Sequence, residues 1–73
     1  MTEHYSMMIA WSNEDQTYIV SFPEWEQAGY AAHIHGDTYE QAGAKGRDLL
    51  AFLVESAQEE GRALPRPRTY AGV

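Results

Sequence analysis

The residues that most readily bind metal ions form an alternating pair near the middle of the chain. His33 and His35 are two positions apart, and residues with this spacing in a strand point to the same face. Two imidazoles on one face can begin a zinc site, which needs three or four ligands. A third ligand is not evident, because His4 or Asp37 would join only through folding or contacts between copies. We therefore expect a surface histidine pair without metal, in which His35 helps to position the start of the following helix.

Other catalytic patterns do not occur in the sequence. There is no Ser-His-Asp order, no glycine loop that cradles phosphates and no Walker-like run. The glycines are scattered at positions that turns and helix packing explain. We expect no catalytic residue and no cofactor.

Length and composition indicate one small domain that covers residues 1–73. A chain of this size buries only about 60% of the surface that its unfolded form exposes, so a homodimer or homotetramer would add needed stability. Cysteine is absent, which fits a reducing cytoplasm. No apolar run approaches the roughly 18 residues of a membrane span, and the N-terminus lacks the basic start of a signal peptide.

The charge balance favours a basic protein partner over nucleic acid. Eleven acidic residues against five basic ones give a formal charge of −6. The basic residues are Lys45, Arg47, Arg62, Arg66 and Arg68. Five bases in so acidic a chain make a poor phosphate-binding patch, so direct nucleic-acid binding is not expected. Complementary fields would instead accelerate and orient docking of a basic protein.

Three strands are predicted in the first half of the chain. Residues 6–12 are mostly apolar and residues 17–22 are rich in β-branched and aromatic types, as strands prefer. The polar turn at 13–16 makes a β-hairpin their simplest connection. Residues 24–29 are predicted to be a loop, and residues 30–35 a third strand.

One long amphipathic helix follows and organises the fold. Asp37 or Thr38 can cap its start, and each has Glu40 or Gln41 three residues on, which makes a capping box. Gly61 is placed to end the helix. The apolar face is predicted to contain Tyr39, Ala42, Gly46, Leu49, Leu50, Leu53 and Ala57.

Two glycines lie inside this helix, where each costs roughly 1 kcal/mol relative to Ala. Gly43 and Gly46 are explained if the helix backbone approaches a sheet closely there. The alternatives are a hinge or a groove for a partner.

A short fourth strand at 69–73 would complete a β-β-β-α-β order, an α+β two-layer domain with an antiparallel sheet of three or four strands and one helix. Its exposed sheet face or an unpaired edge strand is a ready site for self-association.

Several short motifs, in order, resemble the HicB-like antitoxin family. They are the strand end Phe22-Pro23-Glu24, the helix start His35-Gly36-Asp37-Thr38, the helix segment Glu40-Gln41-Ala42, and the exit Gly61-Arg62-Ala63-Leu64-Pro65-Arg66-Pro67. Each motif is weak alone, but their order and spacing over residues 6–73 are fairly specific. The resemblance implies a partial ribonuclease-H-like fold without ribonuclease activity. It also implies neutralisation of a small basic HicA-like toxin that cleaves mRNA.

The chain departs from the family pattern in two places. Family members usually add a C-terminal DNA-binding segment, whereas this sequence stops at Val73, which puts operator binding in doubt. The segment between Pro23 and His35 is longer than usual and lacks the family's L-P-G turn. If this loop shapes the toxin contact, partner specificity has changed or been lost.

The fold analogy raises the question of a two-metal nuclease site, which needs acids converging from a central strand and the helix. Residues 6–12 contain no acid. Asp15, Glu24 and Asp37 are expected at a turn, a strand end and a helix cap, where acids have structural roles. We therefore expect a protein that is not an enzyme.

The aromatic residues divide into core and interface candidates. Tyr18, Phe22 and Phe52 are expected in the core under the helix. Trp25, between Glu24 and Glu26, is the aromatic residue most expected to be exposed as an interface anchor, with buried cover of the hairpin as the alternative. The predicted partner-binding residues are Glu14, Asp15, Glu24, Trp25 and Glu26.

Two functions follow as hypotheses. The first is an oligomeric antitoxin core that occludes a HicA-like toxin by binding its RNA-binding surface. The second is an orphan domain, without a toxin, that self-assembles or binds a small ligand. A neighbouring reading frame for a short Lys/Arg-rich protein would favour the first.

Overall fold

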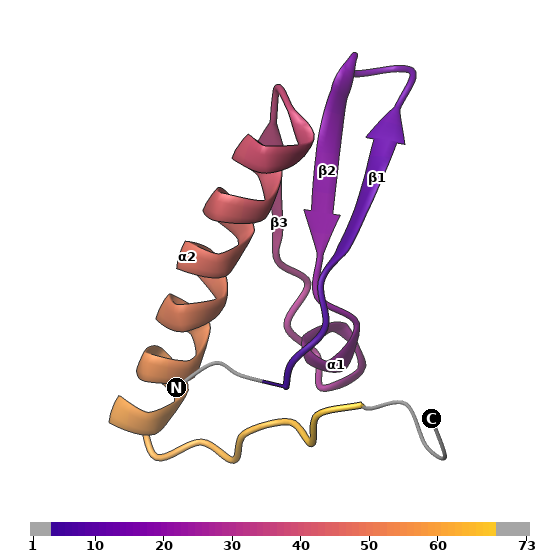
Figure 1. The fold of residues 1–73 in the computed structure, drawn as a ribbon. Helices are drawn as coiled ribbons and strands as arrows, with labels where there is room; N and C mark the ends of the chain where they lie inside the picture. The colour runs from indigo at the N-terminus through magenta and orange to yellow at the C-terminus, as the bar shows by residue number, and fades with distance from the viewer. Residues whose placement is uncertain (1–3, 69–73) are drawn as a thin grey trace, which may run out of the picture.

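The computed structural model describes residues 4–68 and has an α+β architecture (Figure 1). Its elements are β1 (Met8–Ser12), β2 (Thr17–Ser21), α1 (Pro23–Gln27), β3 (His33–Gly36) and α2 (Tyr39–Glu59). The strands form one antiparallel sheet in the order β1-β2-β3, with α2 packed along one face. The predicted sheet-and-helix architecture is confirmed, while the predicted fourth strand at 69–73 lies outside the described residues.

A tight hairpin joins β1 to β2, as the polar turn predicts. Gln16 has a positive φ of 54°, and its N–H donates to the carbonyl of Ser12 at 2.8 Å. This turn sets Ser12 opposite Thr17 and Trp11 opposite Tyr18. Because side chains alternate along a strand, the register fixes which residues face α2.

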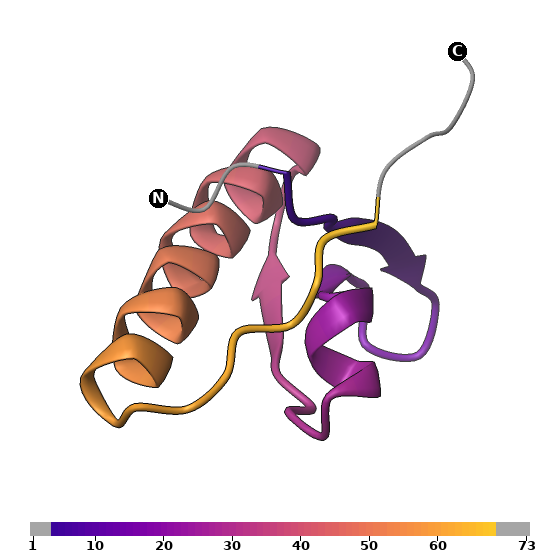
Figure 2. The same cartoon turned by 90° about the horizontal axis from the view of Figure 1, so that it is seen from below.

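The two faces of the sheet differ in their cover. The face toward α2 carries Ile9, Trp11, Tyr18, Val20 and Ile34. The opposite face carries Met8, Ala10, Ile19, Ser21, His33 and His35. None of the described helices packs across this second face, which we call the open face (Figures 1 and 2).

Helix α2 begins and ends with the predicted caps. The hydroxyl of Thr38 accepts from the N–H of Gln41 at 3.0 Å, and the side chain of Gln41 reaches back to the N–H of Asp37 at 2.7 Å. At the other end, the N–H of Arg62 donates to Ala57 and that of Gly61 to Gln58, a Schellman motif. Gly61 has the positive φ of 70° that this motif needs.

The packing of α2 explains its interior glycines. Its buried residues are Ala42, Gly46, Leu50, Val54 and Ala57. A Cβ at Gly46 would lie 2.8 Å from the sulfur of Met7 and 2.9 Å from Cγ1 of Val20, so the close approach to the sheet is confirmed there. The prediction that Phe52 belongs to the core is wrong, because its side chain is 62% exposed.

The predicted loop at 24–29 is wrong, because Pro23–Gln27 forms the short helix α1. Pro23 occupies the first turn, where its missing N–H is harmless, and Glu24 and Glu26 add favourable negative charge. Gly29, with φ of 98°, then turns the chain toward β3. Figure 2 shows the segment after α2 running back past α1.

Candidate protein-binding surface

Three aromatic rings form a row across the end of the sheet that lies next to the hairpin turn. Trp11 and Tyr18 face each other across the hairpin with ring centroids 5.1 Å apart, and Tyr39 follows at 5.4 Å from Tyr18. Both contacts are edge-to-face, the arrangement that aromatic quadrupoles favour. We call Trp11, Tyr18 and Tyr39 the aromatic row.

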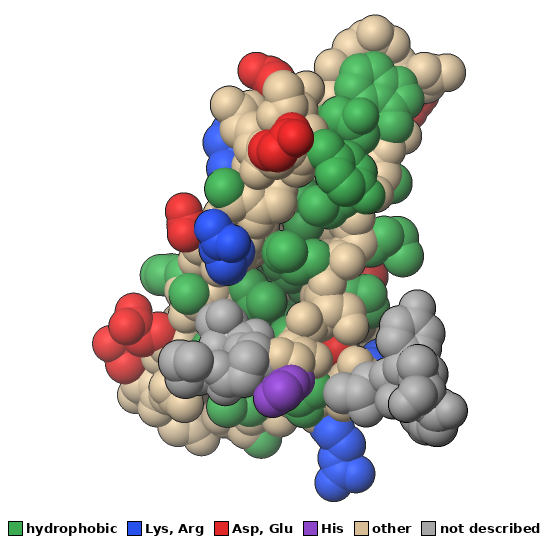
Figure 3. All heavy atoms as spheres, in the orientation of Figure 1, with side chains coloured by type: hydrophobic (Ala, Val, Ile, Leu, Met, Phe, Trp, Pro, Cys, Tyr) green, Lys and Arg blue, Asp and Glu red, His purple; other side chains and the backbone are tan. Residues whose placement is uncertain are grey.

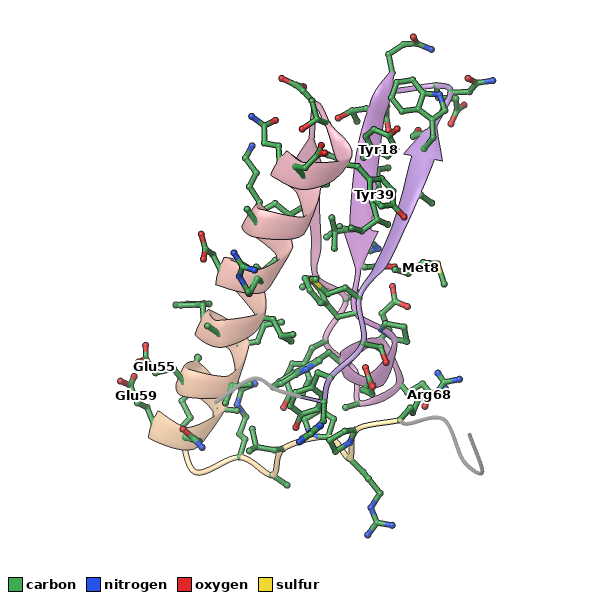
Figure 4. All side chains as sticks on the ribbon, in the orientation of Figure 1. Met8, Tyr18, Tyr39, Glu55, Glu59 and Arg68 are labelled. Carbon is green, nitrogen blue, oxygen red and sulfur yellow. The ribbon has the colours of Figure 1, made fainter. Side chains whose placement is uncertain are left out.

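Much of the aromatic row is accessible to solvent. Trp11 is 49% exposed and Tyr39 is 59% exposed, although both rings are fixed by the half-buried Tyr18 between them. The indole N–H of Trp11 donates to the side chain of Asn13 at 3.1 Å, which further fixes the ring. Figure 3 shows hydrophobic side chains gathered in a strip on this side of the molecule, and Figure 4 shows Tyr18 beside Tyr39. Rigid, exposed aromatic rings are typical anchors of protein interfaces.

Acidic side chains occur at both ends of the aromatic row. Glu14 and Asp15 are exposed in the hairpin turn that follows Trp11. Asp37 and Glu40 are exposed on either side of Tyr39 at the start of α2. Acidic groups beside the apolar strip are visible in Figure 3. An apolar row between carboxylates is suited to a surface that presents Arg and Lys.

The five predicted partner-binding residues do not form one site. Glu14 and Asp15 are at the hairpin turn, whereas Glu24, Trp25 and Glu26 belong to α1 at the far end of the strands (Figure 1). Glu26 is exposed, and its carboxylate lies 3.3 Å from the imidazole of His33. It therefore has a partner within the chain.

Trp25 is buried, so the expectation that it is exposed is wrong and the alternative of buried cover is correct. Its side chain is 1% exposed and packs between Tyr5 and Tyr30, with ring centroids at 5.6 and 5.7 Å. Its indole N–H has no hydrogen-bond partner among the described residues. Because residue 25 lies in the helical turn of α1, its side chain is directed inward, an orientation that a loop would not impose.

Glu24 is also buried, and its carboxylate has a structural role. It accepts from the N–H of Ser6 at 3.1 and 3.2 Å, from the Ser6 hydroxyl at 2.9 Å and from the N–H of Arg68 at 2.9 Å. Burial is the largest influence on the pKa of Glu24 and raises it, but these hydrogen bonds together hold the pKa below its ordinary value. Glu24 thus joins both ends of the described chain and is not available to a partner.

The two strand histidines share the open face, as predicted. His33 lies opposite Ser21 and His35 lies opposite Ile19, so no acid of β2 adjoins them. Within residues 4–68, no group of three or more His, Asp or Glu side chains is arranged to hold a metal ion. In the same part of the chain, no helix is long and apolar enough to cross a membrane.

Sequence reasoning missed the aromatic row, although the signal was present. A four-residue turn at 13–16 sets Trp11 opposite Tyr18 in any regular hairpin.

Comparison with known proteins gives no match to a family model, a curated protein sequence or a solved structure.

Proposed function

We propose that this chain is an antitoxin-type binding protein that neutralises a small basic ribonuclease of the HicA kind by covering its RNA-binding surface. The observation that carries the proposal is the exposed aromatic row with carboxylates at both ends. A ribonuclease must present Lys and Arg to bind phosphates, so its substrate surface is complementary to this arrangement. Occlusion needs no reactive group on the antitoxin, and because the target cleaves mRNA, the complex would form in the cytoplasm.

The rings and the carboxylates would bind neighbouring cations of the same basic surface on the partner. An Arg guanidinium over Trp11 or Tyr39 gains about 0.5–1 kcal/mol when exposed and about 2 kcal/mol when desolvated. Glu14, Asp15, Asp37 and Glu40 would then pair with the other cations of the basic surface. Of the five residues predicted from sequence, this proposal keeps Glu14 and Asp15 and replaces the α1 residues with the aromatic row.

The test is a search for a short Lys/Arg-rich reading frame beside this one and co-expression of its product with this chain, followed by affinity measurement on the purified pair. Tyr39→Ala is expected to weaken binding at least tenfold, about 1.4 kcal/mol, as the loss of an aromatic interface anchor does. Phe52→Ala is the matched control, because Phe52 is an equally exposed aromatic residue on the same helix but far from the row.

A charge-reversal pair separates steering from contact. Glu40→Lys places a cation at the aromatic row, whereas Glu55→Lys makes the same change near the other end of α2 (Figure 4). Only Glu40→Lys should slow association and reduce its dependence on salt. The proposal fails if no basic neighbour binds, or if the row variants and their controls weaken binding equally.

A second candidate function, self-assembly without a toxin, is favoured by one separate observation. The outer edge of β1 has no strand partner among the described residues. This edge is compatible with the antitoxin role as well, and its consequences are developed next.

A further inference from the structure

Strand β1 forms an edge of the sheet with none of the usual protections. Such edges normally carry Lys, Pro or a bulge, because their unpaired N–H and C=O groups otherwise recruit another strand. Residues 6–12, SMMIAWS, contain no charged residue and no proline. The β1–β2 register is regular over all five pairs, from Met8–Ser21 to Ser12–Thr17, so no bulge interrupts the strand. None of the described residues pairs with the outer side of β1.

The side chains of β1 make the same edge apolar as well as unpaired. Met8 is 56% exposed on the open face, and Ala10 is exposed on the same face. Figure 4 shows the side chain of Met8 extending away from the sheet and from α2. Trp11 is half-exposed on the other face. Both faces of this edge therefore leave apolar surface in water.

We propose that β1 pairs antiparallel with β1 of a second copy, about a two-fold axis at Ala10, to form one six-stranded sheet. Pairing over the full strand sets Ala10 opposite its own copy, Ile9 opposite Trp11 and Met8 opposite Ser12. A two-fold axis perpendicular to the sheet keeps each face on its side, so both α2 helices lie on the same face. This inference does not depend on the proposed toxin.

The strand is self-complementary under this operation. Large residues meet small or flat ones: Met8 meets Ser12, and the indole of Trp11 covers the half-buried Ile9 of the partner copy. The chain has a net charge of −6, which opposes self-association in general, yet the strand that meets its copy is uncharged. Backbone pairing thus occurs where repulsion between copies is weakest, and it extends a sheet too small to be strongly stable alone.

Sedimentation or light scattering on the isolated chain gives the first test, with an expected mass twice that of the 8.3 kDa monomer. Ala10→Lys places two like charges opposite each other, roughly 5 Å apart at their Cβ atoms, and should weaken the dimer at least tenfold. High salt should restore much of the dimer by screening, which it would not do for a misfolded variant. Ala51→Lys, the same change at an exposed position of α2, should leave the dimer intact.

Cysteine pairing tests the register. The natural chain has no cysteine, so Met8→Cys and Ser12→Cys each introduce a single thiol. Under mild oxidation, a mixture of the two variants should form the mixed disulfide in preference to either symmetric one, because opposite residues are within disulfide range. Ala10→Cys should cross-link with itself.

Three results would overturn the proposal. The first is a monomer at concentrations up to about 1 mM, the weak limit of ordinary association. The second is a dimer whose symmetric Met8 cross-link exceeds the mixed one, which would indicate stacking of open faces. The third is a full chain that is monomeric while a variant ending at Arg68 dimerises, which would assign the β1 edge to residues 69–73.

Discussion

Ser6 donates both its backbone N–H and its hydroxyl to the buried carboxylate of Glu24. The same carboxylate accepts the N–H of Arg68, so one side chain of α1 ties the residues before β1 to the segment after α2. When a buried carboxylate loses its charge or one of these donors, polar groups inside the protein are left without hydrogen-bond partners.

Replacing Glu24 by Gln should destabilise the fold by about 1–3 kcal/mol, because one carbonyl oxygen cannot serve three donors and the new NH₂ group would face N–H groups. Urea unfolding measures this change. Glu26→Gln is the control on the same short helix: its carboxylate is exposed and paired only with His33, so the effect should stay within about 0.5 kcal/mol. Equal losses in the two variants would contradict the role assigned to Glu24.

The free energy of unfolding should depend on pH through the carboxyl group of Glu24. The pKa of Glu24 is subject first to burial, which raises it, and then to hydrogen bonds from Arg68, its own backbone and Ser6, which bring it below the ordinary 4.5. A carboxyl with a lower pKa in the folded state stabilises that state while ionised. Its contribution is therefore complete above pH 4.5 and is lost as the pH falls through the folded value. Unfolding free energies from pH 7 to 3 should fall more steeply for the natural chain than for Glu24→Gln.

The hydroxyl of Tyr5 forms a second tie, to the carbonyl of Pro65 at 2.6 Å. Tyr5→Phe should cost about 0.5–1.5 kcal/mol and raise amide exchange in the segment after α2 more than in the sheet. Tyr39→Phe, at an exposed ring, is the control and should change neither quantity.

Burial, followed by the charge of Glu24, raises the pKa of Tyr5. The contribution of Tyr5 to the stability of the fold is therefore complete below pH 10 and is lost at more alkaline pH.

The two interior glycines of α2 should respond to alanine with opposite signs. At Gly43 a Cβ would have only Ile9 nearby, at 3.9 Å, so Gly43→Ala should stabilise by about 1 kcal/mol through helix propensity. At Gly46 the Cβ would overlap Val20, which is fully buried and stiff at its branched Cβ. Gly46→Ala should therefore destabilise by about 1–3 kcal/mol. Thermal unfolding of both variants measures the difference, and a shared sign would contradict the close packing of α2 against Val20 at Gly46.

The sequence was sufficient for the elements whose signals are local. The capping side chains of Thr38 and Gln41, the positive φ expected at Gly61 and the hairpin turn all follow from neighbouring residues, and all are present. Helix α1 also had local signals, namely Pro23 at its start and Gly29 beyond its end, but five residues are too few to show periodicity.

Burial was harder to predict because it depends on which surfaces meet. Residue type alone predicts Phe52 in the core, yet it is two positions from the buried Leu50, about 200° around the helix, and so faces solvent. The Glu24 carboxylate joins Ser6 and Arg68, residues 18 and 44 positions away, and no local pattern specifies such contacts. The aromatic row could be predicted from the hairpin register, which sets Trp11 opposite Tyr18, once Tyr39 at the start of α2 is added to the pair.

The two tryptophans should behave oppositely on truncation. Trp25→Ala removes a fully buried ring from its contacts with Tyr5 and Tyr30 and should destabilise the fold by about 3–5 kcal/mol. Trp11→Ala removes a half-exposed ring and should cost about 1 kcal/mol or less, the loss of one edge-to-face contact with Tyr18. Urea unfolding gives both values, and fluorescence of each single-tryptophan variant assigns the signal.

Partner binding and dimerisation should depend on Trp11 and not on Trp25. Trp11 lies in both the aromatic row and the β1 edge, so Trp11→Ala should weaken partner binding and dimerisation while the chain stays folded. A Trp25→Phe variant, which keeps an aromatic ring in the core and removes an indole N–H that has no partner among the described residues, should leave both associations unchanged. If Trp25→Phe abolished association in a folded protein, the surface around α1, rather than the hairpin end, would be the contact.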